Sequence, residues 1–269
     1  MKQGKSSFAP KPIPWQVSLW NPWRPHFCSG VILDHKTILS AASCFKKLKA
    51  MKWIRISAGN IAYKGGQSIH VKKLHFLDHE TDLSIVKLKS SLQFDENTLP
   101  ACLPSAKISA NSRCYFSGWG QSTKLRWLNV RITSQSNCSI NPEHICTHNN
   151  YCIGCEFDEN DAGGPLVCLQ NEHPVIVGIA SSIGNEIIHT KIQNHIDWIK
   201  QLMVSFKSTI ILKSVHTHFR NLKSQLEMEI FVVRMFPQKQ SLSFKQNSLL
   251  GNIPHFMNDT KPLWSSLLS

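Results

Sequence analysis

Short apolar stretches separated by turn residues make up most of the first 200 positions. Residues 15–19 alternate apolar and polar side chains, a period of two that is typical of a half-buried strand. Residues 31–33 and 37–40 indicate a hairpin around an Asp-His-Lys turn. Further strands are expected at 54–57, 84–88 and 175–179. Repeated short strands with Gly, Pro and Asn between them predict an all-β sandwich or barrel.

The period of the pattern changes near residue 192. Ile192, Ile196, Ile199 and Met203 recur at helical spacing. Such spacing places apolar side chains on one face of a helix, so we expect an amphipathic helix over about 192–204. It follows the last expected strand, as a helix closing a β domain would.

The chain divides into three segments on composition. Residues 1–9 form a leader, residues 10–204 the β domain, and residues 205–269 a basic extension that we expect to be poorly packed. The extension contains no cysteine and holds eight Lys and Arg against three acidic residues. A Ser/Gln/Asn-rich run after Pro237 favours a loose end over a second domain.

Length and composition exclude several classes of protein. With 269 residues and 42% hydrophobic content, the chain can bury a sizeable core. A charged fraction of 17% excludes a largely disordered chain or a coiled coil. No run of 18 or more apolar residues occurs, so we expect no membrane-spanning helix.

The net charge of +13 is compatible with a polyanionic partner, such as a heparin-like chain. Lysines cluster at 46, 47, 49 and 52, and again at 72 and 73. Neither interleaved aromatic residues nor a nucleic-acid-binding motif accompanies them in the sequence. We therefore favour a solvated basic surface, keep a polyanion as the alternative, and expect no nucleic-acid partner.

Nine cysteines are many for a reducing compartment and an odd number for a fully disulfide-bonded domain. The cysteine usage favours an oxidising compartment. However, residues 1–20 contain no apolar block of the length that a secretory signal peptide requires, so no signal peptide is visible.

Three motifs resemble those of the trypsin-like serine proteases. They are Cys28–Ile32 followed by Leu39–Cys44, then Asp82–Leu88, and finally Asn160–Cys168. The resemblance covers about residues 10–203. It implies two packed six-stranded antiparallel β-barrels with a C-terminal helix, and a secreted domain that uses no cofactor.

The catalytic triad of that family is incomplete here. By resemblance, Ser43 stands where the family has its histidine base and Ala162 where it has its serine nucleophile, while Asp82 keeps the orienting aspartate. Alanine has no nucleophilic atom, and a serine hydroxyl is not basic enough to replace histidine. A substitute base such as His26, His75 or His79 would have no nucleophile to activate at position 162.

Two further positions of the site depart from the family. Asn160 replaces the glycine whose amide helps to bind the oxyanion, so the sequence does not predict an intact oxyanion hole. Asp161 corresponds to the aspartate that pairs with the amine released by activation cleavage. No matching start precedes residue 12, so we expect Asp161 to lack its partner in a zymogen-like pocket.

The resemblance implies three disulfides: Cys28–Cys44, Cys114–Cys168 and Cys138–Cys146. Cys102, Cys152 and Cys155 are then left over. Two sequons are candidates for glycosylation, at Asn137 and Asn258.

The segment from His144 to Cys155 contains two histidines and three cysteines, which are residues that can bind zinc. Only three residues separate His148 from Cys152, a short distance for two ligand pairs to converge on one ion. We therefore favour a loop with spare thiols and expect no metal site.

Together these features predict a catalytically inactive homologue, a pseudoprotease with a binding or regulatory role toward another protein. A product without a dedicated function, from a degenerate gene copy, is the alternative. A residual serine-type endopeptidase is the weaker alternative.

Overall fold

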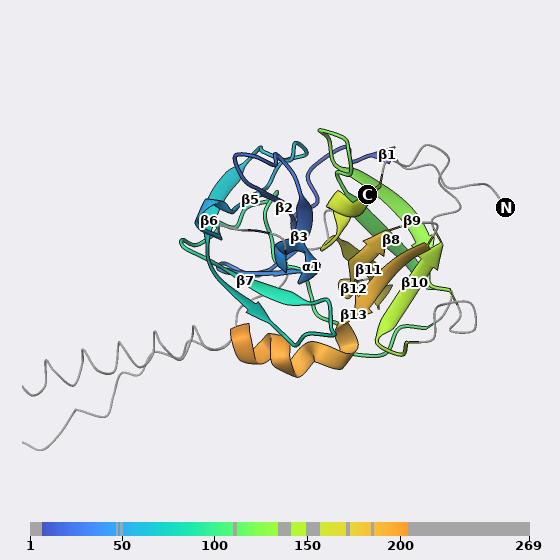
Figure 1. Ribbon diagram of the computed structural model, residues 1–269. Coiled ribbons are helices and arrows are strands. Elements are labelled where there is room, and N and C mark those ends of the chain that lie inside the picture. The colour runs from blue at the N-terminus through green and yellow to red at the C-terminus, as the bar shows by residue number, and fades with distance from the viewer. Residues whose placement is uncertain are drawn as a thin grey trace, which may run out of the picture. The chain divides into compact units, whose positions relative to one another are not determined.

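The computed structural model describes residues 7–46, 48, 51–109, 112–133, 141–148, 157–170, 173–183 and 186–203. Within these ranges the chain forms two packed β-structures and a helix near residue 200 (Figure 1). The predicted extension at 205–269 and the candidate glycosylation sites Asn137 and Asn258 lie outside the described residues.

The first β-structure is a closed barrel of six antiparallel strands, in the order β2-β3-β4-β7-β6-β5. The strands are β2 (Gln16–Trp20), β3 (Cys28–Asp34), β4 (Thr37–Ser40), β5 (Arg55–Ala58), β6 (Gln67–Phe76) and β7 (Ser84–Leu88). Residues 28–33 of β3 are all buried. One of its faces lies inside the barrel and the other lies against the second β-structure, so the strand shows a continuous apolar run instead of alternation.

The hairpin expected at residues 31–40 is confirmed. Asp34 ends β3, and its Oδ1 accepts a hydrogen bond of 2.8 Å from the backbone N–H of Lys36. An aspartate side chain that binds the amide two residues later stabilises a tight turn. This turn sets the β3–β4 register, in which Ile32 lies opposite Ile38.

The second β-structure is a seven-stranded sheet in the order β1-β9-β8-β11-β12-β13-β10. Its strands are β1 (Ser7–Phe8), β8 (Arg113–Gly118), β9 (Arg126–Arg131), β10 (His144–His148), β11 (Pro165–Gln170), β12 (His173–Ile183) and β13 (Glu186–Lys191). An isolated bridge between Ile132 and Thr147 brings the end of β9 back to β10. Six strands thus form the second barrel that the resemblance implies, and β1 adds a seventh strand at the edge of β9.

The expected helix is confirmed, with a tighter first turn. A 3-10 turn, η3 (Ile192–His195), leads into an α-helix at 196–203. Ile192 and Ile199 are fully buried in the cluster that includes the first barrel's core. Lys87 Nζ donates hydrogen bonds of 2.8 Å to Thr37 Oγ1 and 2.7 Å to the Leu202 carbonyl, which fastens the helix to that barrel. No helix in the described ranges is long and apolar enough to cross a membrane.

Two of the three implied disulfides lie entirely within the described residues and are confirmed. Cys28–Cys44 joins β3 to the short helix α1 (Ser43–Lys46), and Cys114–Cys168 joins β8 to β11. Cys146 is also disulfide-bonded, while its implied partner Cys138 lies outside the described residues.

The expectation of a loop from residue 144 onward is wrong for its first part. His144–His148 is strand β10, paired with β13 from His144 opposite Thr190 to His148 opposite Glu186. The pairing places Cys146 in the buried interior. Cys152 and Cys155 lie outside the described residues.

Candidate functional site

The three triad positions meet where the barrels pack together. Ser43 begins α1, Asp82 precedes β7, and Ala162 lies between the turn η2 (Glu159–Asp161) and β11. The first two positions belong to the first barrel and the third to the second. The structure therefore brings together residues that are up to 119 positions apart in the sequence.

The Asp82 carboxylate accepts hydrogen bonds from two serines. The backbone N–H of Ser43 donates to Oδ1 at 2.6 Å, and its Oγ donates to Oδ2 at 2.8 Å. Ser181, from β12, donates its hydroxyl to Oδ2 at 2.6 Å. The aspartate therefore holds Ser43 in place through a hydroxyl group and a backbone amide, and no imidazole takes part in these contacts.

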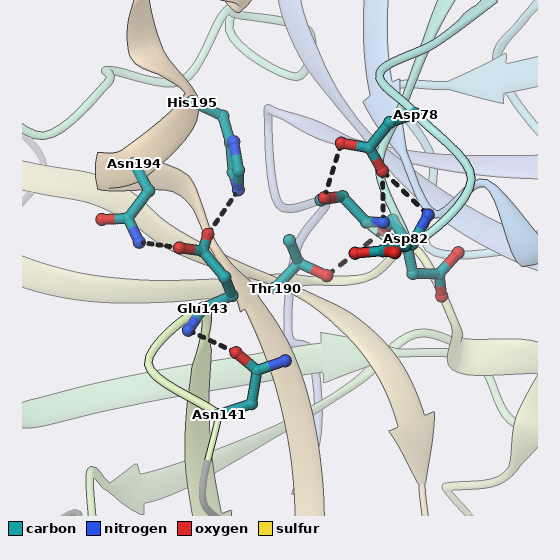
Figure 2. A network of polar contacts seen from close by, with 9 residues as sticks. Asp78, Asp82, Asn141, Glu143, Thr190, Asn194 and His195 are labelled. Carbon is teal, nitrogen blue, oxygen red and sulfur yellow. Dashed lines mark hydrogen bonds and ion pairs between the residues drawn. The ribbon is translucent and has the colours of Figure 1, made fainter.

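The loop that carries Asp82 is held by a contact from β13 and by hydrogen bonds within the loop itself (Figure 2). Thr190 Oγ1 donates a hydrogen bond of 3.3 Å to the backbone carbonyl of Asp82. Asp78 accepts from the Thr81 hydroxyl at 3.0 Å, and a hydrogen bond from the Thr81 backbone N–H holds the pKa of the Asp78 carboxyl below its usual value. Nearby, Glu143 Oε2 lies 3.0 Å from His195 Nε2.

Ala162 is a packing residue in this structure. Its side chain belongs to the same buried cluster as the core of the first barrel. Its carbonyl accepts a hydrogen bond of 2.8 Å from the Ser29 N–H, which ties η2 to β3 across the junction between the barrels. A methyl group at this position fills space but supplies no lone pair for attack on a carbonyl.

The amides that would form an oxyanion hole are engaged within η2. The Asn160 N–H donates to Asp158 Oδ1 at 2.8 Å, and the Ala162 N–H donates to the Glu159 carbonyl at 3.3 Å. An oxyanion hole requires donors that point at the developing negative charge. In this arrangement both donors bind groups of the same turn, which agrees with the departure of Asn160 from the family's glycine.

Asp161 is fully buried and is hydrogen-bonded, although the expected lack of an amine partner stays a prediction. Backbone amides take the place of an amine, because Gly120 N–H donates to Oδ1 at 2.7 Å and Asp158 N–H to Oδ2 at 3.1 Å. Burial, with a smaller effect from the nearby Asp158 charge, raises the pKa of Asp161 to about 7. The carboxyl group is thus accommodated by hydrogen bonding and by ready protonation.

Replacing Asp161 with Asn is expected to change how stability depends on pH. Because the pKa of the folded-state carboxyl is raised to about 7, the folded chain keeps a proton that the unfolded chain loses above about pH 4. This contribution is full below about pH 4 and is lost as the pH rises through 7. Relative to Asp161→Asn, the wild-type free energy of unfolding should fall by about 1.4 kcal/mol per pH unit in this window.

Urea unfolding at several pH values between about 4 and 7 measures this difference. The matched control is Glu96→Gln, since Glu96 is exposed and its removal should leave the pH profile parallel to that of the wild type. Parallel profiles for Asp161→Asn and the wild type would show that the buried carboxyl does not titrate in this range.

The histidines considered as substitute bases do not join the triad positions. His26 Nδ1 shares a hydrogen bond of 2.8 Å with the buried Ser18 hydroxyl, and burial lowers the His26 pKa to about 4. In the described part of the chain, no hydrogen bond links His26, His75 or His79 to Ser43 or Asp82. His26 lies against Trp119, with ring centroids 5.4 Å apart, and is a neutral packing residue at pH 7.

A family model described as Trypsin matches residues 2–199, which is most of the chain and all of both barrels. The chain belongs to the trypsin family. It is 30% identical to Trypsin I-P38 of Gallus gallus over 228 residues, which span 75% of this chain and 89% of that protein. It is 28% identical to Trypsin of Xenopus laevis, over 75% of this chain and 90% of that protein.

Sequence reasoning missed two residues that shape this trypsin-family site. Asp158 caps η2 in a capping box with Asp161, and Ser181 donates to Asp82. The Asp-x-x-Asp spacing at 158–161 resembles the usual sequence signature of such a box and could have revealed the first. Nothing local to Ser181 indicates the second, because its partner lies 99 residues away.

Proposed function

We propose that this trypsin-family chain is a catalytically inactive homologue that acts by binding another molecule. The observation that carries the proposal is the pairing of Ser43 with Asp82, at the position where the family's histidine would stand. A serine hydroxyl bound to a carboxylate cannot accept a proton from a nucleophile at neutral pH.

Two further observations support inactivity. Ala162 provides no nucleophile, and the amides of Asn160 and Ala162 are hydrogen-bonded within η2. In a comparable triad, losing either the nucleophile or the base costs about 10⁶ in turnover. Losing both along with the oxyanion donors leaves no residue in the described site that performs acyl transfer by the family's mechanism.

A binding role is supported by what the chain retains. The closed first barrel, the seven-stranded sheet and the disulfides Cys28–Cys44 and Cys114–Cys168 form a well-packed scaffold with polar partners at Asp82 and Asp161. Disulfides of this kind persist in oxidising compartments, which supports a secreted protein. The same features favour a dedicated binding protein over a product without a function.

The test of inactivity is the hydrolysis of peptide ester and amide substrates by the purified full-length chain. We expect the wild type and Asp82→Ala to give the same rate, equal to the rate in buffer alone. A wild-type rate that exceeds the rate of Asp82→Ala would contradict the proposal, because only a working triad depends on that carboxylate.

A second variant tests whether inactivity comes from the missing side chains or from the hydrogen-bonded amides of η2. We expect Ser43→His with Ala162→Ser to remain far below a trypsin measured in parallel, since restoring two side chains does not free the amide donors. A trypsin-like rate in this variant would show that the backbone of η2 rearranges readily, and that the two side chains alone account for inactivity.

A further inference from the structure

The positive charge of this protein is concentrated in the first part of the chain. Residues 1–77 contain thirteen Lys and Arg but a single acidic residue, Asp34. The remaining 192 residues hold 17 Lys and Arg against 16 Asp and Glu, so they are almost neutral. Nearly all of the net charge of +13 therefore belongs to the first barrel and the segment before it.

Exposed tryptophans occur within this basic region. Trp23, in the β2–β3 connection, is 69% exposed, and Trp53, in the turn η1 (Met51–Trp53), is 43% exposed. Their rings meet edge to face with centroids 6.0 Å apart. Lys52 places its Nζ 5.3 Å from the centre of the Trp53 ring. Two large aromatic rings and a cation thus lie together at the surface.

A second aromatic–cation group adjoins the first. Arg55 follows Trp53 by two residues and lies opposite Trp20 in the β2–β5 ladder. The Arg55 guanidinium lies 5.7 Å from the Trp20 ring centre, and Lys64 Nζ lies 5.2 Å from it. We call these side chains the tryptophan–lysine face, and it consists of Trp20, Trp23, Lys52, Trp53, Arg55 and Lys64.

The cations of this face have no acidic partner among the described residues. The ion pair between His195 and Glu143 lies on other elements. Arg55 donates to His70 Nε2 at 2.7 Å, a neutral acceptor. Burial, followed by the charges of Arg55 and Lys89, lowers the pKa of His70, as expected beside cations that no carboxylate balances.

Folding alone does not account for the tryptophan–lysine face. Large apolar side chains are usually buried, and exposed rings that adjoin one another commonly mark a binding surface. Cations beside indole rings are held in position by cation–π attraction, so their charges are arranged before a ligand arrives. The face therefore presents ordered positive charges next to flat apolar surfaces.

We propose that the tryptophan–lysine face binds a sulfated polysaccharide. The sulfate groups would contact Lys52, Arg55 and Lys64. The apolar faces of the sugar rings would lie on the indoles of Trp23 and Trp53. The proposal deepens the binding role proposed above by naming its partner class, and it does not depend on whether the triad is inactive.

The disulfides favour this partner over a nucleic acid. Cys28–Cys44 and Cys114–Cys168 place the domain in an oxidising compartment. Sulfated polysaccharides are the polyanions of extracellular spaces, whereas nucleic acids are mainly intracellular. Single-stranded nucleic acid nevertheless uses cations and aromatic rings in a similar way, so it serves as a competing probe.

The test is a titration of the full-length chain with a heparin fragment at ~0.05 M and ~0.15 M salt. Binding is monitored by the change in tryptophan fluorescence. We expect binding that weakens with salt, because each cation contact releases counterions. Lys52→Ala with Lys64→Ala should weaken binding about tenfold, and Trp23→Ala should weaken it several-fold and reduce the fluorescence change.

The matched control removes the same charge elsewhere. Lys107 and Lys200 are exposed on other elements, and Lys107→Ala with Lys200→Ala should weaken binding less than twofold. An equal loss in this control would mean that the overall charge binds heparin without a defined site, and would overturn the proposal. Unfolding curves that match the wild type confirm that the variants are folded.

Three more probes define the ligand. Heparin stripped of its sulfates should not bind, and a single-stranded DNA of equal charge should bind more weakly than heparin. Vesicles with anionic lipid should not compete with heparin. Tighter binding of DNA or of the vesicles would overturn the assignment to a sulfated polysaccharide. Substrate hydrolysis is measured separately, so a failure of heparin binding does not bear on the inactivity of the triad.

Discussion

Replacing Gly118 with Ala is expected to lower the free energy of unfolding by about 3–5 kcal/mol. Gly118 ends β8, and a Cβ atom there would overlap the buried carboxyl group of Asp161. The carboxyl group cannot move away without losing the hydrogen bond from the Gly120 amide. Overpacking and an unsatisfied buried acceptor would then add together.

Urea unfolding of the variant measures this loss, and a double-mutant cycle identifies its cause. Asp161→Ala removes the group that the new methyl would meet, so the double variant should lose about 1–2 kcal/mol less than the sum of the two single losses. Strictly additive losses would show that Gly118 is needed for a reason other than its approach to Asp161.

Removing the Cys114–Cys168 disulfide by replacing both residues with Ala is expected to cost about 4 kcal/mol of unfolding free energy. The corresponding change at Cys28–Cys44 should cost about 3 kcal/mol, because a shorter loop loses less entropy when it is closed in the unfolded chain. The sequence separations are 54 and 16 residues. Loss of the second disulfide should also loosen α1, which carries Ser43.

Cys102→Ala is the matched control for these variants. Cys102 is a free and exposed cysteine, so its replacement should change the unfolding free energy by less than about 0.5 kcal/mol. Chemical denaturation under non-reducing conditions compares the three variants with the wild type. Equal losses at the two disulfides would argue against a loop-entropy origin of their stability.

Much of the fold could be predicted from local patterns. The strands expected at 15–19, 37–40 and 84–88 match β2, β4 and β7 within one residue, because apolar period and turn chemistry act over a few residues. The strand β10 was not predicted, since its histidines and cysteine were weighed as metal ligands and then assigned to a loop. Only pairing with β13, about 40 residues away, makes that segment a strand.

The site was predictable as a set of positions but not as a set of contacts. The motifs around Ser43, Asp82 and Ala162 are sufficient to place the triad positions that the resemblance implies. The sequence does not reveal that Ser181 donates a hydrogen bond to Asp82, or that the Gly120 amide donates one to Asp161. Ser181 and Gly120 are distant in sequence from the carboxyl groups they bind, so spacing carries no information about them, whereas the Asp158 amide belongs to the local capping box.

The sequence by itself determined the family, the strand pattern and the side chains at the triad positions, because these depend on residue type and short-range order. Tertiary structure alone decided that Ser181 binds Asp82, that the Gly120 amide binds Asp161, and that Trp23 lies against Trp53. Trp20 and Trp23, Lys52, and Lys64 come from three stretches of chain that the closed barrel brings to one surface. Closure of a barrel juxtaposes residues by strand order, so cations and rings from separate stretches of the basic first part become a defined face only when the strands pair.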